Sequence, residues 1–352
     1  MRGWGDLPGD DPRRDREAAS AQLEAAGIDL DPAPPGRQRR HADDHGVAGH
    51  AHPHRQSATG EPPVIGIVGA GAVGTVLGVA LSRAGWPIHA VASRDATRRE
   101  RFRSLVEVGR VFVDPEPLLD EVELIILAVP DDVIAPLAGT LRMYGGQAMI
   151  HTSGALGAEV LAPAMAAGTQ VGSFHPLVAV ADTERAVAAL HGATVAIEGD
   201  DQLAALLAAM AEAIGATPVR LAPGTKTAYH AAAVLAAGGF VALLDAIAEL
   251  GQVAGLDEAG SLAIYGRLIE GTLANAKALG IGAALTGPIT RGDIGTLRAH
   301  LDVLRARAPL VMDLYVAAAR REIRLAQGRR TLAPEIVQSM LELLTEAVAR
   351  PD

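Results

Sequence analysis

The sequence contains no cysteine and few aromatic residues, 3% of the total. The absence of cysteine excludes disulfide bonds, thiolate metal ligands and a cysteine nucleophile. Positive charge is also scarce, because 31 Lys and Arg residues stand against 41 Asp and Glu residues, a net charge of −10. Such a chain is repelled by phosphate backbones and by anionic lipid surfaces, so nucleic acid and membranes are poor partners. The composition is compatible with the cytoplasm, which is the location that we predict.

Two uncharged stretches have the composition of a membrane span, residues 64–81 and residues 231–244. The first contains five glycines, which is typical of a strand, a tight turn and a helix start. The second reaches Asp245 before the roughly 20 apolar residues that a span requires. We therefore predict that neither crosses a membrane.

The chain of 352 residues is long enough for two domains. Residues 1–62 are rich in Arg, Asp, Pro, Gly and His and have little apolar surface to bury, so we predict a disordered extension there. Five histidines in this extension are compatible with a metal-binding cluster or with a solvated tail, and we predict no metal site: His41, His45, His50, His52 and His54.

From Val64 onward, short apolar runs alternate with helical patterns, and each run is bounded by Gly, Pro or Asp. This pattern predicts an α/β Rossmann fold, a doubly wound parallel sheet, over residues 63–222. The predicted strands are Val64 to Val68, Ile88 to Ala92, Leu124 to Val129, Ala148 to His151, Val171 to Phe174, Thr194 to Ile197 and Thr217 to Leu221.

Long helical periodicity replaces this alternation after Pro223-Gly224, which predicts an all-α domain over residues 223–350. Its helices are alanine-rich, and small residues let helices approach closely, so we expect it to form a homodimer. The predicted helices are Thr225 to Ala254, Glu258 to Leu279, Ile294 to Ala306, Pro309 to Gln327 and Pro334 to Ala349.

The first predicted strand runs into a glycine-rich turn, G-x-G-x-x-G, followed by an apolar helix. The first glycine permits a tight turn, the second lets the backbone approach a pyrophosphate, and the third lets the helix pack on the strand. The amino end of that helix then faces the phosphates. The pattern predicts a dinucleotide site that includes Gly69, Gly71, Val73 and Gly74.

The second predicted strand ends in Ser93-Arg94, where NAD-specific proteins carry an acidic residue that binds the ribose diol. A hydroxyl and a guanidinium instead favour a 2′-phosphate, because Arg offers a permanent charge and a bidentate fork. We therefore predict NADP(H) as the cofactor. Asp95 follows directly, and Arg94 could equally be a solvent-facing residue.

Polar residues follow three further strands, at the edge where ligands bind in open α/β sheets. Ala128, Val129 and Pro130 are predicted to border the cofactor, although the following Asp131 could also serve as a helix cap. His151 precedes the hydroxyl pair of Thr152 and Ser153 on the next strand, and His175 ends the one after. Thr152 and His175 are candidate substrate-binding residues.

Lys226, Tyr229 and His230 stand at positions i, i+3 and i+4 of the first long helix, and hence on one helical face. A lysine that faces a cleft can donate a proton to a carbonyl that accepts hydride, and His230 can orient or share that proton. The alternative is a surface lysine at a helix start. Further along, Arg291 in a polar loop could bind a substrate carboxylate, while Asp293 there could simply cap the next helix.

Six motifs together resemble one Rossmann-like family whose carboxy-terminal half is known as domain of unknown function 2520. They are G-A-G-A-V-G, A-V-P-D, H-T-S-G-A-L, S-F-H-P-L, K-T-A-Y-H-A-A-A and T-G-P-I-T-R-G-D, and the resemblance covers about residues 63–345. The family is similar to the group that includes 6-phosphogluconate, 3-hydroxyisobutyrate, ketopantoate and pyrroline-5-carboxylate dehydrogenases or reductases.

The resemblance implies that Lys226 is the catalytic lysine, although His230 stands where that group has an asparagine. It also gives Ser153 a role in holding the substrate. The expected activity is NADP-dependent reduction of a small 2-keto acid, with ketopantoate as the leading candidate. The alternatives are reduction of a cyclic imine such as pyrroline-5-carboxylate, and a non-catalytic NADP-binding sensor.

Overall fold

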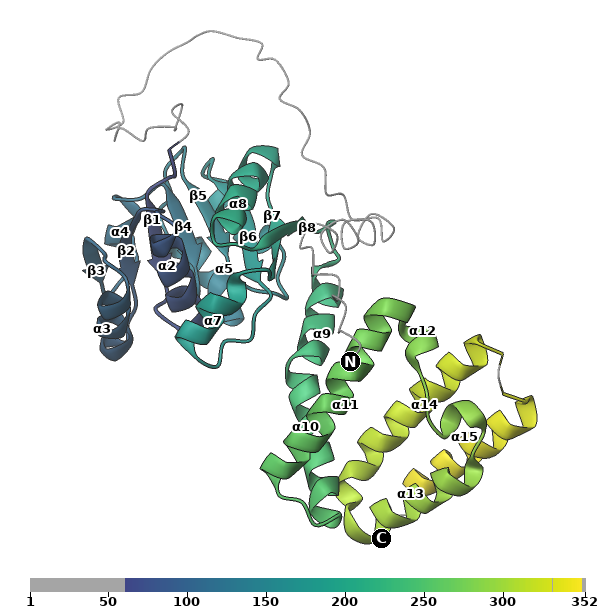
Figure 1. The fold of residues 1–352 in the computed structure, drawn as a ribbon. Helices are drawn as coiled ribbons and strands as arrows, with labels where there is room; N and C mark the ends of the chain where they lie inside the picture. Colours follow the sequence, from purple (N-terminus) through teal and green to yellow (C-terminus); the bar gives the residue numbers. More distant parts are fainter. Residues whose placement is uncertain (1–60, 331, 350–352) are drawn as a thin grey trace, which may run out of the picture. The chain divides into compact units, whose positions relative to one another are not determined.

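The computed structural model describes residues 61–330 and 332–349. Nearly all of the predicted extension, including its five histidines, therefore lies outside the described residues. The chain forms two compact units that divide between Ala233 and Val234, within helix α9 (Lys226–Ala236) (Figure 1). Each unit is described by itself below.

The first unit is built on a single eight-stranded sheet, with strand order β3-β2-β1-β4-β5-β6-β7-β8. Strands β2 and β3 lie on one side of β1, and the later strands, starting with β4, lie on its other side. This order is that of a doubly wound Rossmann sheet. The predicted fold class is thus confirmed. The strands are β1 (Ile65–Val68), β2 (Ile88–Ala92), β3 (Arg110–Phe112), β4 (Leu124–Leu127), β5 (Ala148–His151), β6 (Gln170–Pro176), β7 (Thr194–Glu198) and β8 (Thr217–Arg220).

Two features of this sheet differ from the expectation. Strand β7 pairs antiparallel with β6, with Phe174 opposite Ile197, whereas all other neighbours are parallel. The intervening helix α7 (Thr183–Leu190) packs on α2 (Ala72–Arg83) instead of returning the chain across the sheet, and buried runs of either direction look alike in sequence. The short edge strand β3 has partly exposed residues, so it gave no apolar run to recognise.

Helices cover both faces of the sheet. Side chains such as Ile67, Leu77 and Leu207 are fully buried on one face, and Ile125, Leu127 and others on the opposite one. Each such side chain contributes roughly 1.5–3 kcal/mol by leaving water. The first face carries α2, α3 (Ala96–Leu105), α7 and α8 (Asp201–Ala213), and the second α4 (Glu116–Leu119), α5 (Asp131–Thr140), η1 (Ala158–Leu161) and α6 (Ala162–Met165).

The described residues of the second unit form helices and connecting loops and no strand, as the sequence predicts. Its core is formed mainly by α13, α14 and α15. The predicted helix over residues 225–254 is two helices, because the backbone leaves the helical region at Ala237 (φ −106°, ψ −86°), just before two glycines of low helix propensity. The helices are α10 (Gly238–Val253), α11 (Glu258–Leu279), α12 (Ile281–Ala284), η2 (Ile289–Arg291), α13 (Ile294–Arg307), η3 (Pro309–Val311), α14 (Met312–Gly328) and α15 (Pro334–Ala349).

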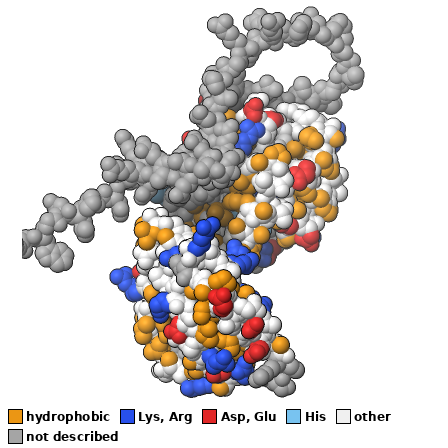
Figure 2. Space-filling model, turned by 90° about the vertical axis from the view of Figure 1, so that its right-hand side faces the viewer, with side chains coloured by type: hydrophobic (Ala, Val, Ile, Leu, Met, Phe, Trp, Pro, Cys, Tyr) orange, Lys and Arg blue, Asp and Glu red, His pale blue; other side chains and the backbone are white. Residues whose placement is uncertain are grey.

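Helices α9 and α10 present more apolar surface than the sequence analysis allowed. By length and composition alone, Lys226–Val253 could cross a membrane, and only 11% of its most apolar window is buried. The charge at Asp245 therefore does not by itself exclude a membrane span, contrary to the expectation from sequence, because a span tolerates an occasional charge. Figure 2 shows hydrophobic side chains at the surface between charged ones. In α9, α10 and α11 the exposed ones are Val234, Leu235, Phe240, Val241, Leu243, Leu262, Ile264, Leu268, Leu273 and Leu279.

Candidate functional site

A cavity of about 830 Å³ lies at the carboxyl ends of the strands of the first unit. Its lining comes from the turns after β1, β2, β4 and β5, from the segment after β3, from helix α5, and from one residue each of α3 and α9. All of these residues belong to the first unit. The position is the one at which open α/β sheets bind their ligands.

The glycine turn after β1 forms one wall, and its geometry requires glycine at two positions. Gly69 has φ +108°, and a methyl group there would lie 2.2 Å from the carbonyl oxygen of Ala128. A methyl group on Gly74 would lie 2.0 Å from the carbonyl oxygen of Gly69, so this glycine lets α2 pack against the turn. Gly71, by contrast, has open space where a side chain would start, with only the guanidinium of Arg98 at 4.0 Å. A ligand can therefore approach its backbone.

The amino end of α2 faces this cavity with its backbone N–H groups available. Gly71 is the N-cap, no side chain caps the helix, and its first turn has no acidic residue. Gly71, Ala72 and Val73 all line the cavity. The positive end of the helix dipole and free N–H donors make this an anion-binding end.

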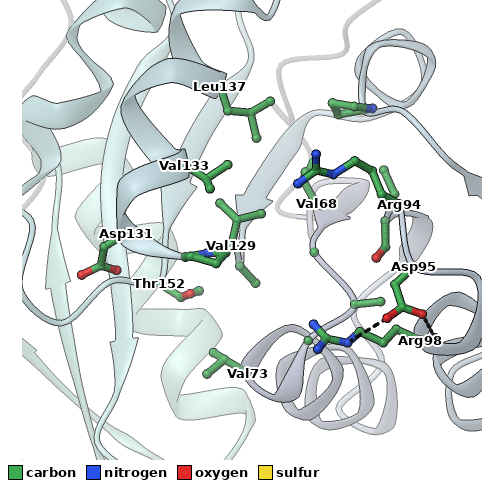
Figure 3. A pocket seen from close by; sticks show the side chains of 18 of the residues that line it. Val68, Val73, Arg94, Asp95, Arg98, Val129, Asp131, Val133, Leu137 and Thr152 are labelled. Carbon is green, nitrogen blue, oxygen red and sulfur yellow. Dashed lines mark hydrogen bonds and ion pairs between the residues drawn. The ribbon is translucent and has the colours of Figure 1, made fainter.

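Basic side chains line the cavity where β2 ends. Arg94 makes no hydrogen bond or ion pair with any described residue, whereas Arg98 pairs with Asp95 at 3.3 Å. Asp95 also caps α3 by accepting a hydrogen bond from the Arg98 backbone N–H at 3.0 Å. Figure 3 shows these three side chains across the cavity from Val129 and the α5 side chains. Two guanidinium groups therefore flank this end, and the sequence analysis had missed Arg98.

The side chain of His151 supports the loop after β5 through contacts with its backbone. This side chain is fully buried, its Nδ1 accepts from the Ser153 N–H at 3.2 Å, and its Nε2 lies 3.1 Å from the carbonyl oxygen of Gly157. Burial and the nearby ammonium of Lys226 lower the pKa of His151 to about 4, so its ring is neutral near pH 7. A neutral ring suits this pair of contacts, with the proton on Nε2. His151 therefore shapes the loop.

Ser153 and Thr152 present hydroxyl groups in this loop, and both line the cavity. The Ser153 Oγ accepts hydrogen bonds from the N–H groups of Ala155 and Leu156, at 3.2 and 3.0 Å. These contacts fix the oxygen and leave its O–H free to donate. The Thr152 Oγ1 lies 3.5 Å from the carbonyl oxygen of Leu127, at the limit of hydrogen-bond distance.

Next to this loop, His230 contributes the α9 side chain that lines the cavity. Its ring packs edge-on against that of His175, with ring centres 5.5 Å apart, and His175 packs edge-on against Tyr229 at 5.8 Å. Three atoms of this group are buried without a hydrogen-bond partner among the described residues, Nδ1 of each histidine and the Tyr229 hydroxyl. Buried polar atoms of this kind are rare and call for an explanation.

Lys226 is placed differently from the sequence expectation. It is only 3% exposed and does not line the cavity. Its ammonium donates hydrogen bonds to the Ser173 hydroxyl at 2.5 Å and to Oε2 of Glu198 at 3.1 Å, and the Ser173 hydroxyl itself donates to Glu198 at 2.7 Å. Burial lowers the pKa of Lys226, while the charge and hydrogen bond of Glu198 act to raise it. Lys226 therefore forms a buried ion pair with Glu198 of β7 and a hydrogen bond with Ser173 of β6.

Most of the predicted site residues thus lie around one cavity: Gly69, Gly71, Val73, Ser93, Arg94, Ala128, Val129, Pro130, Thr152, Ser153 and His230. Gly74 and His175 lie directly behind it. Arg291 ends η2 in the second unit, and in the same loop Asp293 caps α13 by accepting from the Thr296 N–H at 2.9 Å. Ser173 belongs to the S-F-H-P-L motif, but neither Ser173 nor Glu198 was predicted as a site residue, because single polar residues in apolar strands are common.

The fold and the cavity together define a Rossmann-type dinucleotide-binding domain followed by a helical domain. Two family models match the chain, the Rossmann-like domain over residues 51–176 and the domain of unknown function DUF2520 over residues 193–322. These two matches confirm the resemblance inferred from the motifs. No curated protein matches the chain.

Solved structures share this architecture over about three quarters of the chain. A candidate NADP oxidoreductase from Bacteroides fragilis is 25% identical, with 75% of this chain and 98% of that chain covered and a TM-score of 0.63. Protein TM1727 from Thermotoga maritima is also 25% identical, with 76% and 100% covered and a TM-score of 0.59. A 1-pyrroline-5-carboxylate reductase from Streptococcus pyogenes is 15% identical and shares the fold. The match covers 76% of this chain and 99% of that chain, with a TM-score of 0.52.

Proposed function

We propose that the protein is an NADPH-dependent reductase of a small carboxylate that carries a C=O or C=N group. The observation that carries this proposal is one cavity that joins the glycine turn, the unpaired Arg94 and the imidazole of His230. The glycine turn and Arg94 suit the phosphates of a dinucleotide. The imidazole of His230 can supply the proton that a reducible C=O or C=N group requires. The likeness to the Bacteroides fragilis oxidoreductase supports the choice of NADP.

The residues around the cavity fit this cofactor. The uncapped amino end of α2 and the open backbone at Gly71 suit a pyrophosphate, and Arg94 with Arg98 suits a 2′-phosphate. Ala128, Val129 and Pro130 offer a mostly apolar wall for the rest of the molecule. When bound, NADPH supplies the hydride. The side chains of the chain must then orient the substrate and supply a proton.

Ketopantoate is the leading substrate candidate, and 1-pyrroline-5-carboxylate is the alternative. The Ser153 hydroxyl, whose oxygen is fixed by two backbone N–H groups, can donate to a carboxylate or carbonyl oxygen, and Thr152 lies beside it. A ketone acquires full negative charge on oxygen as hydride arrives, so it needs a proton donor more than a protonated imine does. The donor on His230 therefore favours the keto acid.

Two measurements test the proposed function. Titration of the full chain with NADPH and NADH, followed by cofactor fluorescence, should show saturable binding with NADPH preferred. Loss of NADPH absorbance is then followed with ketopantoate and with 1-pyrroline-5-carboxylate. Turnover of ketopantoate supports the leading candidate, and turnover of the imine alone supports the alternative. Tight NADPH binding with no turnover of either would favour a sensor, and absence of NADPH binding would refute the proposal.

We propose further that the protein acts as a cytoplasmic homodimer. Ten large apolar side chains of α9, α10 and α11 are exposed, and clustered exposed apolar residues of this kind often mark an interface. A second copy of the chain offers the same apolar residues in return, as a two-fold interface requires. Arg291, in the second unit, remains a predicted ligand of the substrate carboxylate.

A further inference from the structure

The imidazole pair of His230 and His175 has a geometry that the reductase proposal does not by itself explain. Both rings press against the backbone of Gly154. A methyl group there would lie 2.2 Å from Nδ1 of His230 and 2.7 Å from Nε2 of His175. The φ angle of Gly154 is not positive, so close packing by the two rings, and not backbone conformation, requires a glycine at this position.

The two nitrogens of His230 have different surroundings. Nδ1 is buried and has no hydrogen-bond partner among the described residues. Nε2 makes no hydrogen bond to a described residue either, but it is not fully buried, and His230 is one of the residues that line the cavity. Packing therefore fixes the position of the ring, and its Nε2 is accessible to a ligand in the cavity.

The charge state of its neighbour restricts where a proton can reside. Burial, then His230 and then the ammonium of Lys226 lower the pKa of His175 to about 4. His175 is thus neutral near pH 7 and is a poor proton donor to a substrate. Lys226, which is one helical turn before His230 in α9, is anchored by Ser173 and Glu198 and so fixes the start of the helix that carries this ring.

We propose that Nε2 of His230 is the group that contacts and protonates the reacting oxygen or nitrogen atom, with His175 and Gly154 positioning its ring. The inference rests on the proposed reductase function. As hydride forms the new C–H bond, the π pair of C=O moves to oxygen, the N–H bond of the His230 imidazolium breaks and an O–H bond forms. The neutral imidazole then regains a proton from water. Lys226 is a positioning residue that does not touch the substrate.

The test uses the full chain with ¹⁵N-labelled histidine, saturated with NADP⁺ and titrated with oxamate, an unreactive mimic of a 2-keto acid, and with pyrrole-2-carboxylate, a planar mimic of a cyclic imine acid. Two-bond ¹H–¹⁵N correlation spectra report on each ring nitrogen, and the His230→Asn variant assigns the signal. We expect a saturable shift of the His230 Nε2 signal with at least one probe. Unmoved His230 signals with both probes would overturn the inference.

Gly154→Ala provides the second arm, because its methyl group must displace both rings. We expect an affinity for the probe at least about tenfold lower than that of the wild type. NADPH affinity should fall much less, because it depends mainly on the glycine turn and Arg94. Gly139→Ala, at a glycine with open space around it, is the matched control and should behave as wild type. Probe binding by Gly154→Ala equal to wild type would refute the inference. If Gly154→Ala does not fold, His230→Asn replaces it, with the same loss expected and the same refuting result.

The failure of the proposed function can be recognised separately. It is tested by NADPH binding in the wild-type chain, which depends mainly on the glycine turn and Arg94. If NADPH does not bind, the proposed function is refuted, and the inference that rests on it is refuted as well. NADPH binding with unmoved His230 signals overturns the inference alone.

Discussion

The ammonium of Lys226 lies 3.1 Å from Oε2 of Glu198, and the two side chains are only 3% and 12% exposed. Removing one partner of a buried ion pair leaves the other charge without compensation, which typically costs about 3–5 kcal/mol. Lys226→Met should therefore lower the free energy of unfolding of the first unit by that amount. Urea unfolding followed by circular dichroism measures it.

Two variants serve as controls for this prediction. Adding Glu198→Gln to Lys226→Met removes the orphaned charge and should restore part of the loss. Arg267→Met breaks an exposed pair with Glu270, whose side chains are 86% and 68% exposed, and should have almost no effect. A Lys226→Met chain as stable as wild type would show that the pair does not hold the site together.

Replacing His230 tests the chemistry directly. His230→Leu should lower the turnover number by about 10²-fold to 10⁴-fold, the range for a lost proton donor, because leucine fills the space without a donor. NADPH affinity should change little, since the phosphate-binding features lie at the glycine turn and at Arg94. Steady-state rates with the substrate that is turned over, together with NADPH titration, give both values. Undiminished turnover would exclude His230 as the donor.

Cofactor preference should depend on the two arginines after β2. Arg94→Ala should cost about 1.5–3 kcal/mol in NADPH affinity through loss of a charge-assisted hydrogen bond, with little change for NADH. Arg98→Ala should cost less, because its guanidinium already pairs with Asp95. Arg103→Ala, on the same helix but not lining the cavity, is the control. Equal losses for both cofactors would contradict the assignment of a 2′-phosphate site.

Acid should destabilise the first unit through two histidines. The folded-state pKa values of His151 and His175 are about 4, below the value of about 6.5 expected in the unfolded chain. The unfolded state therefore binds protons first as pH falls. The stability due to the neutral rings is complete above about pH 6.5 and is lost between there and about pH 4, by up to about 1.4 kcal/mol per pH unit for each ring.

Urea unfolding at several pH values across this window measures the effect. His151→Gln should flatten the dependence, because the glutamine cannot take up a proton, whereas replacement of the exposed His191 should not. An unfolding midpoint that is the same at both ends of the window would contradict the prediction.

The oligomeric state should depend on the apolar surface of α10 and α11. Light scattering should give a mass of about twice 36.2 kDa, and Val241→Glu with Leu268→Glu should give a monomer. Leu310→Glu is the control, because Leu310 is 88% exposed but lies in η3, outside this surface. A wild-type mass near 36.2 kDa at micromolar concentration would disprove the dimer. Recovery of the chain in the membrane fraction would indicate a lipid partner instead.

Features that depend on local order could be predicted from the sequence alone. The glycine turn was recognisable because Gly69 adopts a positive φ of +108° and Gly74 packs against the carbonyl oxygen of Gly69, five residues earlier. Helices such as α11 and α15 were recognisable from their periodicity. Local steric and hydrogen-bonding rules are sufficient for such features.

The choice between Lys226 and His230 as the side chain that faces the cavity depends on long-range contacts in the fold. Lys226 and His230 share one helical face, and from the sequence the lysine was the natural proton donor. The fold brings Ser173 and Glu198, from strands β6 and β7, to the lysine, and a buried charge must take such partners. His230, one turn later, meets Gly154 and the cavity instead. These contacts join residues 28 to 76 positions apart, and no local pattern in the sequence specifies them.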